Sequence, residues 1–313
     1  MNILVFGKDG QLGRAFQEKL GEAVFQKDNA ILSVGRHDCN LTDPSSISNL
    51  LNEFKPQLII NAAAYTAVDR AESDSDTAFA VNASAPEVMA QFAVENGATL
   101  LHFSTDYVFD GSKQGSYTEI DQTNPLGVYG KSKEAGERAI KDAFKEASAG
   151  QYAILRTSWV YGDGGNFIRT ILRLAKERSE LRVIEDQYGA PTSAAWLAGV
   201  ACHLAIEDGQ LRKFSSGIYH AVPKGETNWH GLACLAVQAA LDSGQSLKTV
   251  KANISPIPAS EYPLPGPRPM NSRLCRDKLQ VELERLGLVS KLPHWNTPWD
   301  EQVTAYVKSL SSH

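Results

Sequence analysis

The stretch VFGKDGQLG, residues 5–13, constrains the fold of this chain more than any other. It follows a short apolar run and opens a segment with helical periodicity, residues 11–20. Gly7 permits a tight turn, Gly10 lets the backbone approach a diphosphate, and Gly13 allows close packing of helix on strand. Strand, glycine loop and helix in this order predict a dinucleotide-binding site, because free N–H groups at a helix start attract phosphate. The alternative is a merely structural glycine-rich turn.

The first half of the chain alternates between apolar runs and amphipathic segments. Apolar runs separated by helices indicate a parallel sheet covered on both faces. We therefore expect an α/β fold with a doubly wound parallel sheet of the Rossmann type, which binds ligands at the carboxyl ends of its strands. The expected strands are 3–6, 30–34, 57–64, 98–105 and 152–157, and the expected helices are 11–20, 43–54, 76–97 and 129–146.

After about residue 160 the pattern loosens, and glycine and proline become frequent. We expect residues 1–160 to form the dinucleotide-binding Rossmann domain. Residues 161–313 should form mainly a smaller, mixed C-terminal substrate-binding lobe, with some segments returning to the Rossmann core. Within this half we expect helices at 193–207 and 228–241 and a strand at 217–222.

The last helix carries start signals of its own. Thr297 fits the N-cap position, Pro298 the first helical position and Asp300 the carboxylate of a capping box. We therefore expect the Thr297 side chain to cap this helix.

Composition excludes several classes of protein. Of the 313 residues, 42% are hydrophobic and 21% charged, which is typical of a soluble globular chain. A net charge of −5 gives no sign of the positive surface that nucleic-acid binding needs. No apolar run approaches the ~18 residues that span a membrane. The N-terminal MNILVFG enters a strand directly, so we expect no secretion signal and a cytoplasmic protein. Four dispersed cysteines are expected to be reduced thiols rather than disulfides or a zinc site.

The end of the second strand bears on the choice of cofactor. NAD-binding chains carry an acidic residue here for the ribose 2′-hydroxyl. In LSVGRHD, residues 32–38, the strand ends in Gly35 and Arg36 follows, and an arginine can clamp a 2′-phosphate through two hydrogen bonds. We therefore expect NADPH as cofactor, with NADH still possible because Asp38 is close. The alternative is that Arg36 is an ordinary surface residue.

A reactive constellation follows the fourth strand. Ser104 and Thr105 lie at its carboxyl end, and Tyr129 and Lys133 are four apart in the next helix, so they share one face. A ketone reduced by hydride needs a proton source and donors around the developing alkoxide. A lysine ammonium favours the phenolate, so we expect Lys133 to lower the pKa of Tyr129. Alone, the pair reads as an ordinary aromatic and lysine on a helix face. With the glycine loop and Thr105 it predicts catalysis.

At this point the chain resembles the dTDP-4-dehydrorhamnose reductase family of extended short-chain dehydrogenase/reductases. The resemblance covers almost the whole chain. It rests on GKDGQLG, NAAAYTAVDRAES, STDYVFDG, NPLGVYGKSKEAGE, RTSWVYG, DQYGAPTS and RPMNSRL. It implies reduction of the 4-keto group of dTDP-4-dehydro-L-rhamnose to dTDP-L-rhamnose, with a reduced nicotinamide cofactor, for surface polysaccharides.

The resemblance also implies residue roles. Tyr129 is the proton donor, Lys133 tunes it and holds the nicotinamide ribose, and Thr105 assists. The implied cofactor-binding residues are Gly7, Gly10, Gln11, Leu12, Arg36, Asn40, Leu41, Ala63, Ala64, Tyr65, Tyr129 and Lys133. The implied substrate-binding residues are Thr105, Asp106, Trp159 and Arg268. A core position is the alternative for Trp159.

The chain departs from the family at one implied metal site. Some relatives hold Mg²⁺ at a dimer interface through three carboxylates, at positions that match Ala15, Ala195 and Asp300 here. A hard dication needs several oxygen ligands, and two of the three are methyl groups. We therefore expect no metal, and a monomer or weak dimer without a Mg-bridged interface.

Two other functions remain open. The first is that of another nucleotide-sugar enzyme, a reductase or an epimerase. A dehydratase is disfavoured, because Thr105-Asp106-Tyr107 lacks the second acid that elimination needs. The other is a non-catalytic, NADP-binding regulatory subunit like that of methionine adenosyltransferase complexes. The nucleotide, dTDP or UDP, and the stereochemistry at C4 also remain open.

Overall fold

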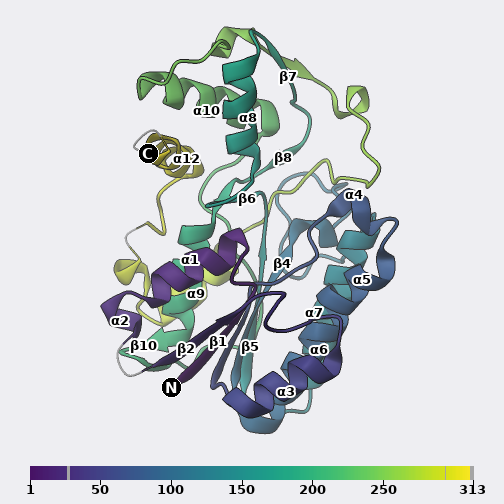
Figure 1. The fold of residues 1–313 in the computed structure, drawn as a ribbon, viewed down its shortest axis with the longest axis vertical. Coiled ribbons are helices and arrows are strands. Elements are labelled where there is room, and N and C mark those ends of the chain that lie inside the picture. Colours follow the sequence, from purple (N-terminus) through teal and green to yellow (C-terminus); the bar gives the residue numbers. More distant parts are fainter. Residues whose placement is uncertain (27–28, 293, 311–313) are drawn as a thin grey trace.

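A six-stranded, all-parallel sheet forms the centre of the molecule (Figure 1). The computed structural model describes residues 1–26, 29–292 and 294–310. The strand order is β12-β5-β4-β3-β1-β2. The strands are β1 (Asn2–Phe6), β2 (Ala30–Val34), β3 (Leu58–Asn61), β4 (Thr99–Thr105), β5 (Gln151–Thr157) and β12 (Gly217–His220). Since β1 pairs with β2 on one side and β3 on the other, the strand order reverses beside the glycine loop, where such sheets bind ligands.

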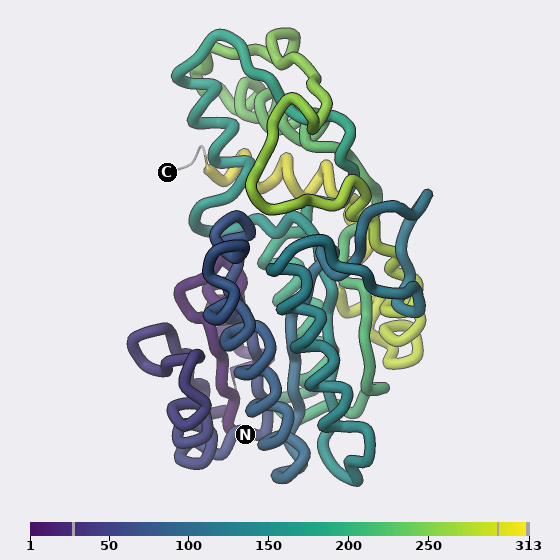
Figure 2. Tube along the Cα trace, turned by 90° about the vertical axis from the view of Figure 1, so that its right-hand side faces the viewer, coloured from purple at the N-terminus to yellow at the C-terminus, as the bar shows by residue number. Residues whose placement is uncertain are grey.

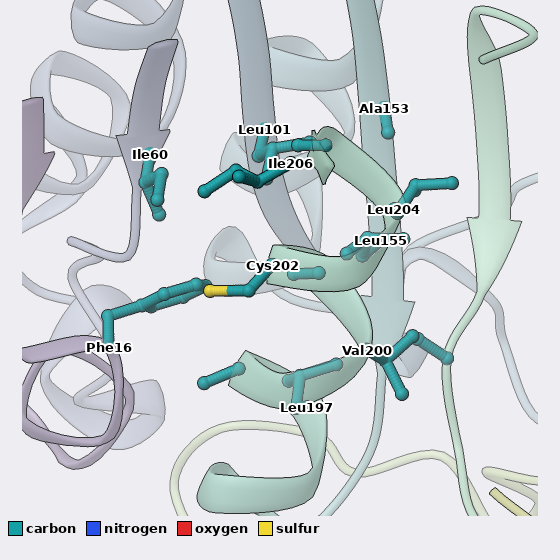
Figure 3. Close-up of a cluster of buried hydrophobic side chains, with 14 of the residues drawn as sticks. Phe16, Ile60, Leu101, Ala153, Leu155, Leu197, Val200, Cys202, Leu204 and Ile206 are labelled. Atoms are coloured by element: carbon teal, nitrogen blue, oxygen red, sulfur yellow. The ribbon is translucent and has the colours of Figure 1, made fainter. Parts of the chain in front are cut away.

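Helices cover both faces of this sheet. On one face, α1 (Gln11–Leu20), α9 (Ala194–Ala205) and α11 (Asp277–Arg285) share an apolar cluster with the odd-numbered residues of β1. The close-up in Figure 3 shows Phe16 of α1 and Cys202 of α9 pointing toward each other within this cluster, which also contains strand residues such as Leu101. On the other face, α3 (Pro44–Phe54), α6 (Ala85–Asn96) and α7 (Val128–Phe144) lie side by side, as Figure 2 shows. Alternate strand residues therefore point into two separate cores, which confirms the doubly wound α/β fold.

A smaller lobe lies beyond the carboxyl ends of the strands (Figure 1). Its helices α8 (Phe167–Glu177), α10 (Trp229–Asp242) and α12 (Trp299–Ser309) pack around two apolar clusters. A parallel pair, β7 (Leu181–Ile184) and β14 (Ile254–Ile257), completes it. Helices α9 and α11 and strand β12 follow residue 160 but return to the central sheet. We therefore propose that residue 160 ends the first Rossmann segment and does not end the Rossmann domain.

Shorter elements connect these units. Two-residue strands pair as β6 (Val160–Tyr161) with β9 (Thr192–Ser193), β8 (Tyr188–Gly189) with β13 (Thr227–Asn228), and β10 (Ile206–Glu207) with β11 (Gln210–Leu211). The short helices are α2 (Ala23–Gln26), α4 (Val68–Ala71) and α5 (Ser75–Phe79), with 3-10 turns at Asp106–Val108, Lys251–Asn253, Ala259–Glu261 and Val289–Lys291. Among the described residues, no helix is both long and apolar enough to cross a membrane.

The helix expected at 76–97 is not continuous. It consists of α5, a π-helical turn at Ala80–Ser84, and α6. Pro86 at the start of α6 has no N–H to donate to the carbonyl of Asn82, so regular α-helical bonding stops there. The third strand is also shorter than expected, because it ends at Asn61 and leaves Ala62–Ala64 in the loop.

The predicted capping of the last helix is wrong. Helix α12 begins at Trp299, its N-cap position is Pro298, and no side chain caps it. The Trp299 N–H instead donates to the backbone carbonyl of Lys224 at 3.0 Å. A neighbouring segment therefore satisfies the group that Thr297 was expected to serve.

Candidate active site

The glycine loop is tightly folded against the third-strand loop. Gly7 has a φ of +91°, and a Cβ there would lie 2.7 Å from the Ala63 nitrogen. A Cβ on Gly13 would lie 1.9 Å from the Gly7 oxygen, so only glycine lets α1 start this close to β1. No side chain caps the start of α1 at Gly10. The N–H groups of Gln11 and Leu12 there fit a diphosphate, as a dinucleotide site requires.

An internal ion pair lies at the expected ribose end of this site. The Asp38 carboxylate accepts a hydrogen bond from the Gly35 N–H at 2.8 Å and pairs with the Lys8 ammonium at 2.6 Å. Hydrogen bonding from Lys8, then from Gly35, lowers the pKa of Asp38. Arg36 is exposed beside this pair, and among the described residues it makes no hydrogen bond or ion pair. Arg36 is therefore a cation available to a 2′-phosphate, whereas Lys8 is already paired with Asp38.

The other predicted cofactor residues line the loops after β2 and β3. Asn40 accepts hydrogen bonds from the Thr42 N–H and hydroxyl, and Leu41 packs at the edge of the core under α3. The Tyr65 hydroxyl donates to Asp74 at 2.9 Å. The Tyr65 backbone is held on both sides by the buried Asn82 amide. Ala63 and Ala64 lie between β3 and Tyr65, beside the glycine loop.

The reactive residues meet at the carboxyl end of β4. The Thr105 hydroxyl donates to Asp106 at 3.0 Å, accepts from the Tyr107 N–H at 3.2 Å and interacts with the Tyr129 hydroxyl. The Tyr107 ring meets the Tyr129 ring edge-on, with centroids 5.3 Å apart. The structure therefore brings Thr105, Asp106 and Tyr129 together at the sheet edge where this fold binds ligands.

Tyr129 remains a protonated phenol in the chain alone. Burial raises its pKa to about 12, and the Asp106 charge acts in the same direction, while Thr105 acts against both. Desolvation of the phenolate dominates this pKa, so the lowering expected from Lys133 stays a prediction. A protonated phenol is still the form that gives up a proton.

Lys133 is held away from solvent by a backbone carbonyl and a histidine ring. Its Nζ atom donates to the Phe103 carbonyl at 2.6 Å and lies 3.3 Å from Nε2 of His102. Burial lowers the pKa of Lys133 to about 8, against the opposing effect of the Glu137 carboxylate. The lysine is therefore still mainly charged at neutral pH.

Asp106 is a buried carboxyl group next to these residues. Burial raises its pKa to about 6, while hydrogen bonding from Ser272 and Thr105 acts in the opposite direction. Ser272 comes from the RPMNS stretch of the C-terminal half, so the second half of the chain contributes to the site.

The remaining predicted substrate residues have protein partners of their own. Trp159, with an unusual φ of +50°, stacks on Trp229 at 3.7 Å between ring centroids. The Arg268 guanidinium pairs with both carboxylate oxygens of Asp69, at 2.6 and 2.9 Å. Arg268 therefore ties the 263–272 loop to the segment after β3, and it does not project freely toward a ligand.

Sequence reasoning missed several buried polar residues around the site. His102 and Asn61 flank Lys133 and the third-strand loop, and Asn82 bonds Ser132 at 3.0 Å. Glu137 forms a buried, two-bond ion pair with Arg156. A polar residue inside an apolar strand, such as His102 in LLHFST, was the available signal.

Comparison with known proteins agrees with this geometry. The family model described as the RmlD substrate binding domain matches residues 1–310. A relative from Salmonella typhimurium named dTDP-4-dehydrorhamnose reductase is 42% identical over 300 residues, which cover 94% of each chain. A Clostridium acetobutylicum structure of that name is 33% identical, with a TM-score of 0.84 and 99% coverage of each chain. A Bacillus anthracis structure of that name, in complex with NADP, is 31% identical, with a TM-score of 0.82 and 98% coverage of each. The chain belongs to the dTDP-4-dehydrorhamnose reductase family of oxidoreductases.

Proposed function

We propose that this protein reduces the 4-keto group of dTDP-4-dehydro-L-rhamnose to give dTDP-L-rhamnose, in nucleotide-sugar synthesis for polysaccharides in the cytoplasm. The observation that carries the proposal is the contact of Tyr129 with Thr105 at the carboxyl end of β4, with buried Lys133 behind it. Membership of the family supports the same substrate.

NADPH is the proposed cofactor, with NADH as a weaker alternative. The glycine loop and the uncapped start of α1 fit a dinucleotide diphosphate. Arg36 supplies positive charge for a 2′-phosphate, and Lys8 would add to it only by sharing its pairing with Asp38. The NADP complex of the Bacillus anthracis relative supports this choice. When bound, the reduced nicotinamide supplies the hydride.

The residues of the chain supply the proton and the positioning. Reduction of a ketone leaves an alkoxide on O4, a far stronger base than a phenolate, so the Tyr129 hydroxyl transfers its proton to it. Thr105 is placed to stabilise the same oxygen by hydrogen bonding. Lys133 then stabilises the phenolate that Tyr129 becomes, and we propose that it also holds the nicotinamide ribose.

We propose that the substrate contacts extend beyond the reacting oxygen. Asp106 lies beside Thr105, and Trp159 presents an indole suited to the apolar face of a deoxysugar. Arg268 would meet the nucleotide diphosphate only by sharing or releasing Asp69, with which it is paired.

The test is NADPH oxidation by the purified protein with a panel of dTDP- and UDP-linked 4-keto sugars. The expected result is fastest turnover with dTDP-4-dehydro-L-rhamnose and a dTDP-L-rhamnose product. Turnover confined to another sugar would reassign the substrate. Tight NADPH binding without oxidation of any sugar would instead indicate a regulatory subunit.

A further inference from the structure

His102 is a fully buried histidine between two polar residues of the site. It lies in β4, three residues before Thr105, directly opposite Asn61 of β3. Its Nδ1 atom lies 3.1 Å from the Asn61 side-chain amide and its Nε2 atom 3.3 Å from the Lys133 ammonium. Each of the three side chains belongs to a residue at most 1% exposed. The contacts therefore form one closed network away from water.

The charges around this network keep the imidazole neutral. Burial lowers the pKa of His102 well below its ordinary value, and the Lys133 ammonium acts in the same direction. The nearest carboxylate on α7 is that of Glu137, which acts on Lys133 and is already paired with Arg156 of β5. Tyr129, also on α7, stays a neutral phenol. One ring nitrogen of His102 is therefore a donor and the other an acceptor.

The tautomer of His102 is coupled to the charge of Lys133. An ammonium can only donate, so a charged Lys133 requires Nε2 as acceptor and the proton on Nδ1. In the structure the Asn61 Nδ2 atom faces Nδ1, so the amide must turn its oxygen toward Nδ1 and give up a weak bond from the Ala63 N–H at 3.3 Å. With the opposite tautomer, Nε2–H points at Nζ, and only an uncharged lysine can accept it.

We propose that His102 is a positioning residue whose Nε2 atom, together with the Phe103 carbonyl, holds Lys133 in its charged form. These two acceptors take two of the three N–H groups of the ammonium and leave the third for a ligand. The relevance to catalysis rests on the proposed function, in which charged Lys133 stabilises the Tyr129 phenolate. Loss of the His102 acceptor favours the neutral amine, because a buried ammonium needs its hydrogen bonds.

Two substitutions separate the contacts of the two ring nitrogens. An asparagine amide reaches about as far as Nδ1, so His102→Asn keeps the contact to Asn61 and loses the one to Lys133. A glutamine amide reaches about as far as Nε2, so His102→Gln keeps an acceptor for Lys133. Both variants carry neutral amides, which makes them matched controls for polarity.

The first measurement is the titration of the Lys133 ¹³Cε signal by NMR in ¹³C-lysine-labelled protein, assigned with Lys133→Arg. We expect His102→Gln to titrate like the wild type and His102→Asn about one pKa unit lower, the effect of one lost charged hydrogen bond. Equal titration in all three proteins would overturn the proposal. This measurement needs no turnover, so it stands even if the proposed substrate is wrong.

Kinetics give a readout that loss of stability alone would not produce. We expect His102→Asn to move the basic limb of the kcat/KM profile about one unit lower, with roughly tenfold slower turnover above pH 8 and little change at pH 6. The KM for the sugar should change less than about twofold, and His102→Gln should restore the wild-type profile. A uniform loss at every pH in both variants would contradict the proposal.

A variant-free measurement covers the case in which His102→Asn does not fold. The ¹⁵N chemical shifts of the His102 ring distinguish its tautomers in the wild-type protein at pH 7. The expected form has the proton on Nδ1 and a bare Nε2. A proton on Nε2 would refute the role proposed for this histidine.

Discussion

At the scale of single residues, burial decides the chemistry of the site. The phenol of Tyr129 and the carboxyl of Asp106 both have raised pKa values, because each would leave a charge without solvent. Lys133 responds in the opposite direction for the same reason. The site thus keeps Tyr129, the proposed proton donor, protonated at neutral pH, with the mainly charged Lys133 on the same helix.

Asp106→Asn should stabilise the protein above pH 6. The folded-state pKa of Asp106, about 6, lies above the ordinary 3.8, so the native state binds the extra proton and stability falls as pH rises from about 4 to 6. At one pKa unit per 1.4 kcal/mol, the cost at pH 7.5 is about 3 kcal/mol. Asparagine carries no such cost and still accepts from Thr105.

Urea unfolding of wild type and variant at pH 4.5 and pH 7.5 measures this effect. The advantage of the asparagine variant should be small at the lower pH and near its maximum at the higher one. A difference that does not change with pH would show that Asp106 titrates normally in the folded protein.

At the scale of elements, α7 is placed by close backbone contacts. A Cβ on Gly136 would lie 2.1 Å from the carbonyl oxygen of Asn82 in the π-helical turn. The Asn82 carbonyl, which cannot receive a helical hydrogen bond from Pro86, therefore faces Gly136 of α7. This contact sets how near α7, with Tyr129 and Lys133, approaches the loop after β3.

Gly136→Ala should destabilise the protein by roughly 1 to 3 kcal/mol, the usual cost of overpacking a core, although alanine is the better helix former. Gly165→Ala is the matched control, because a Cβ there meets nothing within 4 Å. Thermal melting of the two variants compares them directly. Equal melting temperatures would mean that α7 can shift without cost, contrary to this account.

Most elements were predictable from local pattern, whereas their interruptions were not. The apolar runs of β1, β2, β4 and β5 are bounded by polar or glycine residues, so strand positions follow from the sequence alone. Pro86 was a local signal for the interruption at 80–84, but the contacts of Asn82 with Tyr65 and Ser132, two partners distant in sequence, were not predictable. The start of α12 likewise depends on Lys224, about 75 residues earlier.

The site could be predicted from the sequence only for the residues that belong to recognisable motifs. Thr105 and Tyr129 interact at the carboxyl end of β4, and Lys133, one helical turn after Tyr129, donates to Phe103 of the same strand. His102 was not singled out, because a histidine in a strand reads as an ordinary core residue until its partners are known. The pairing of Arg268 with Asp69 joins positions 199 apart in the chain and has no local signature.

At the scale of the whole molecule, two lobes form one site. The Rossmann core contributes Thr105, Asp106 and Tyr129, and the C-terminal half contributes Ser272 beside Asp106. The Arg268–Asp69 pair holds the 263–272 loop against the core. We propose that the sheet positions the reacting groups and that the second lobe brings residues that distinguish substrates.

Assembly should not depend on magnesium. Ala15 is a buried residue of α1, and neither its side chain nor that of Ala195 offers an oxygen ligand. Asp300 alone cannot hold the dication. Light scattering and activity should be the same in excess Mg²⁺ and in EDTA, with the mass of a monomer or a weak dimer. A dimer that forms with Mg²⁺ and dissociates in EDTA would contradict this expectation.

The most direct test of the central claim is the turnover of Tyr129→Phe. This variant keeps the half-buried ring and its packing against Tyr107 but removes the hydroxyl that interacts with Thr105. We predict at least about a hundredfold lower NADPH oxidation with dTDP-4-dehydro-L-rhamnose, the scale of a lost general acid, and unchanged NADPH binding. Turnover close to that of the wild type would show that the proton comes from another group.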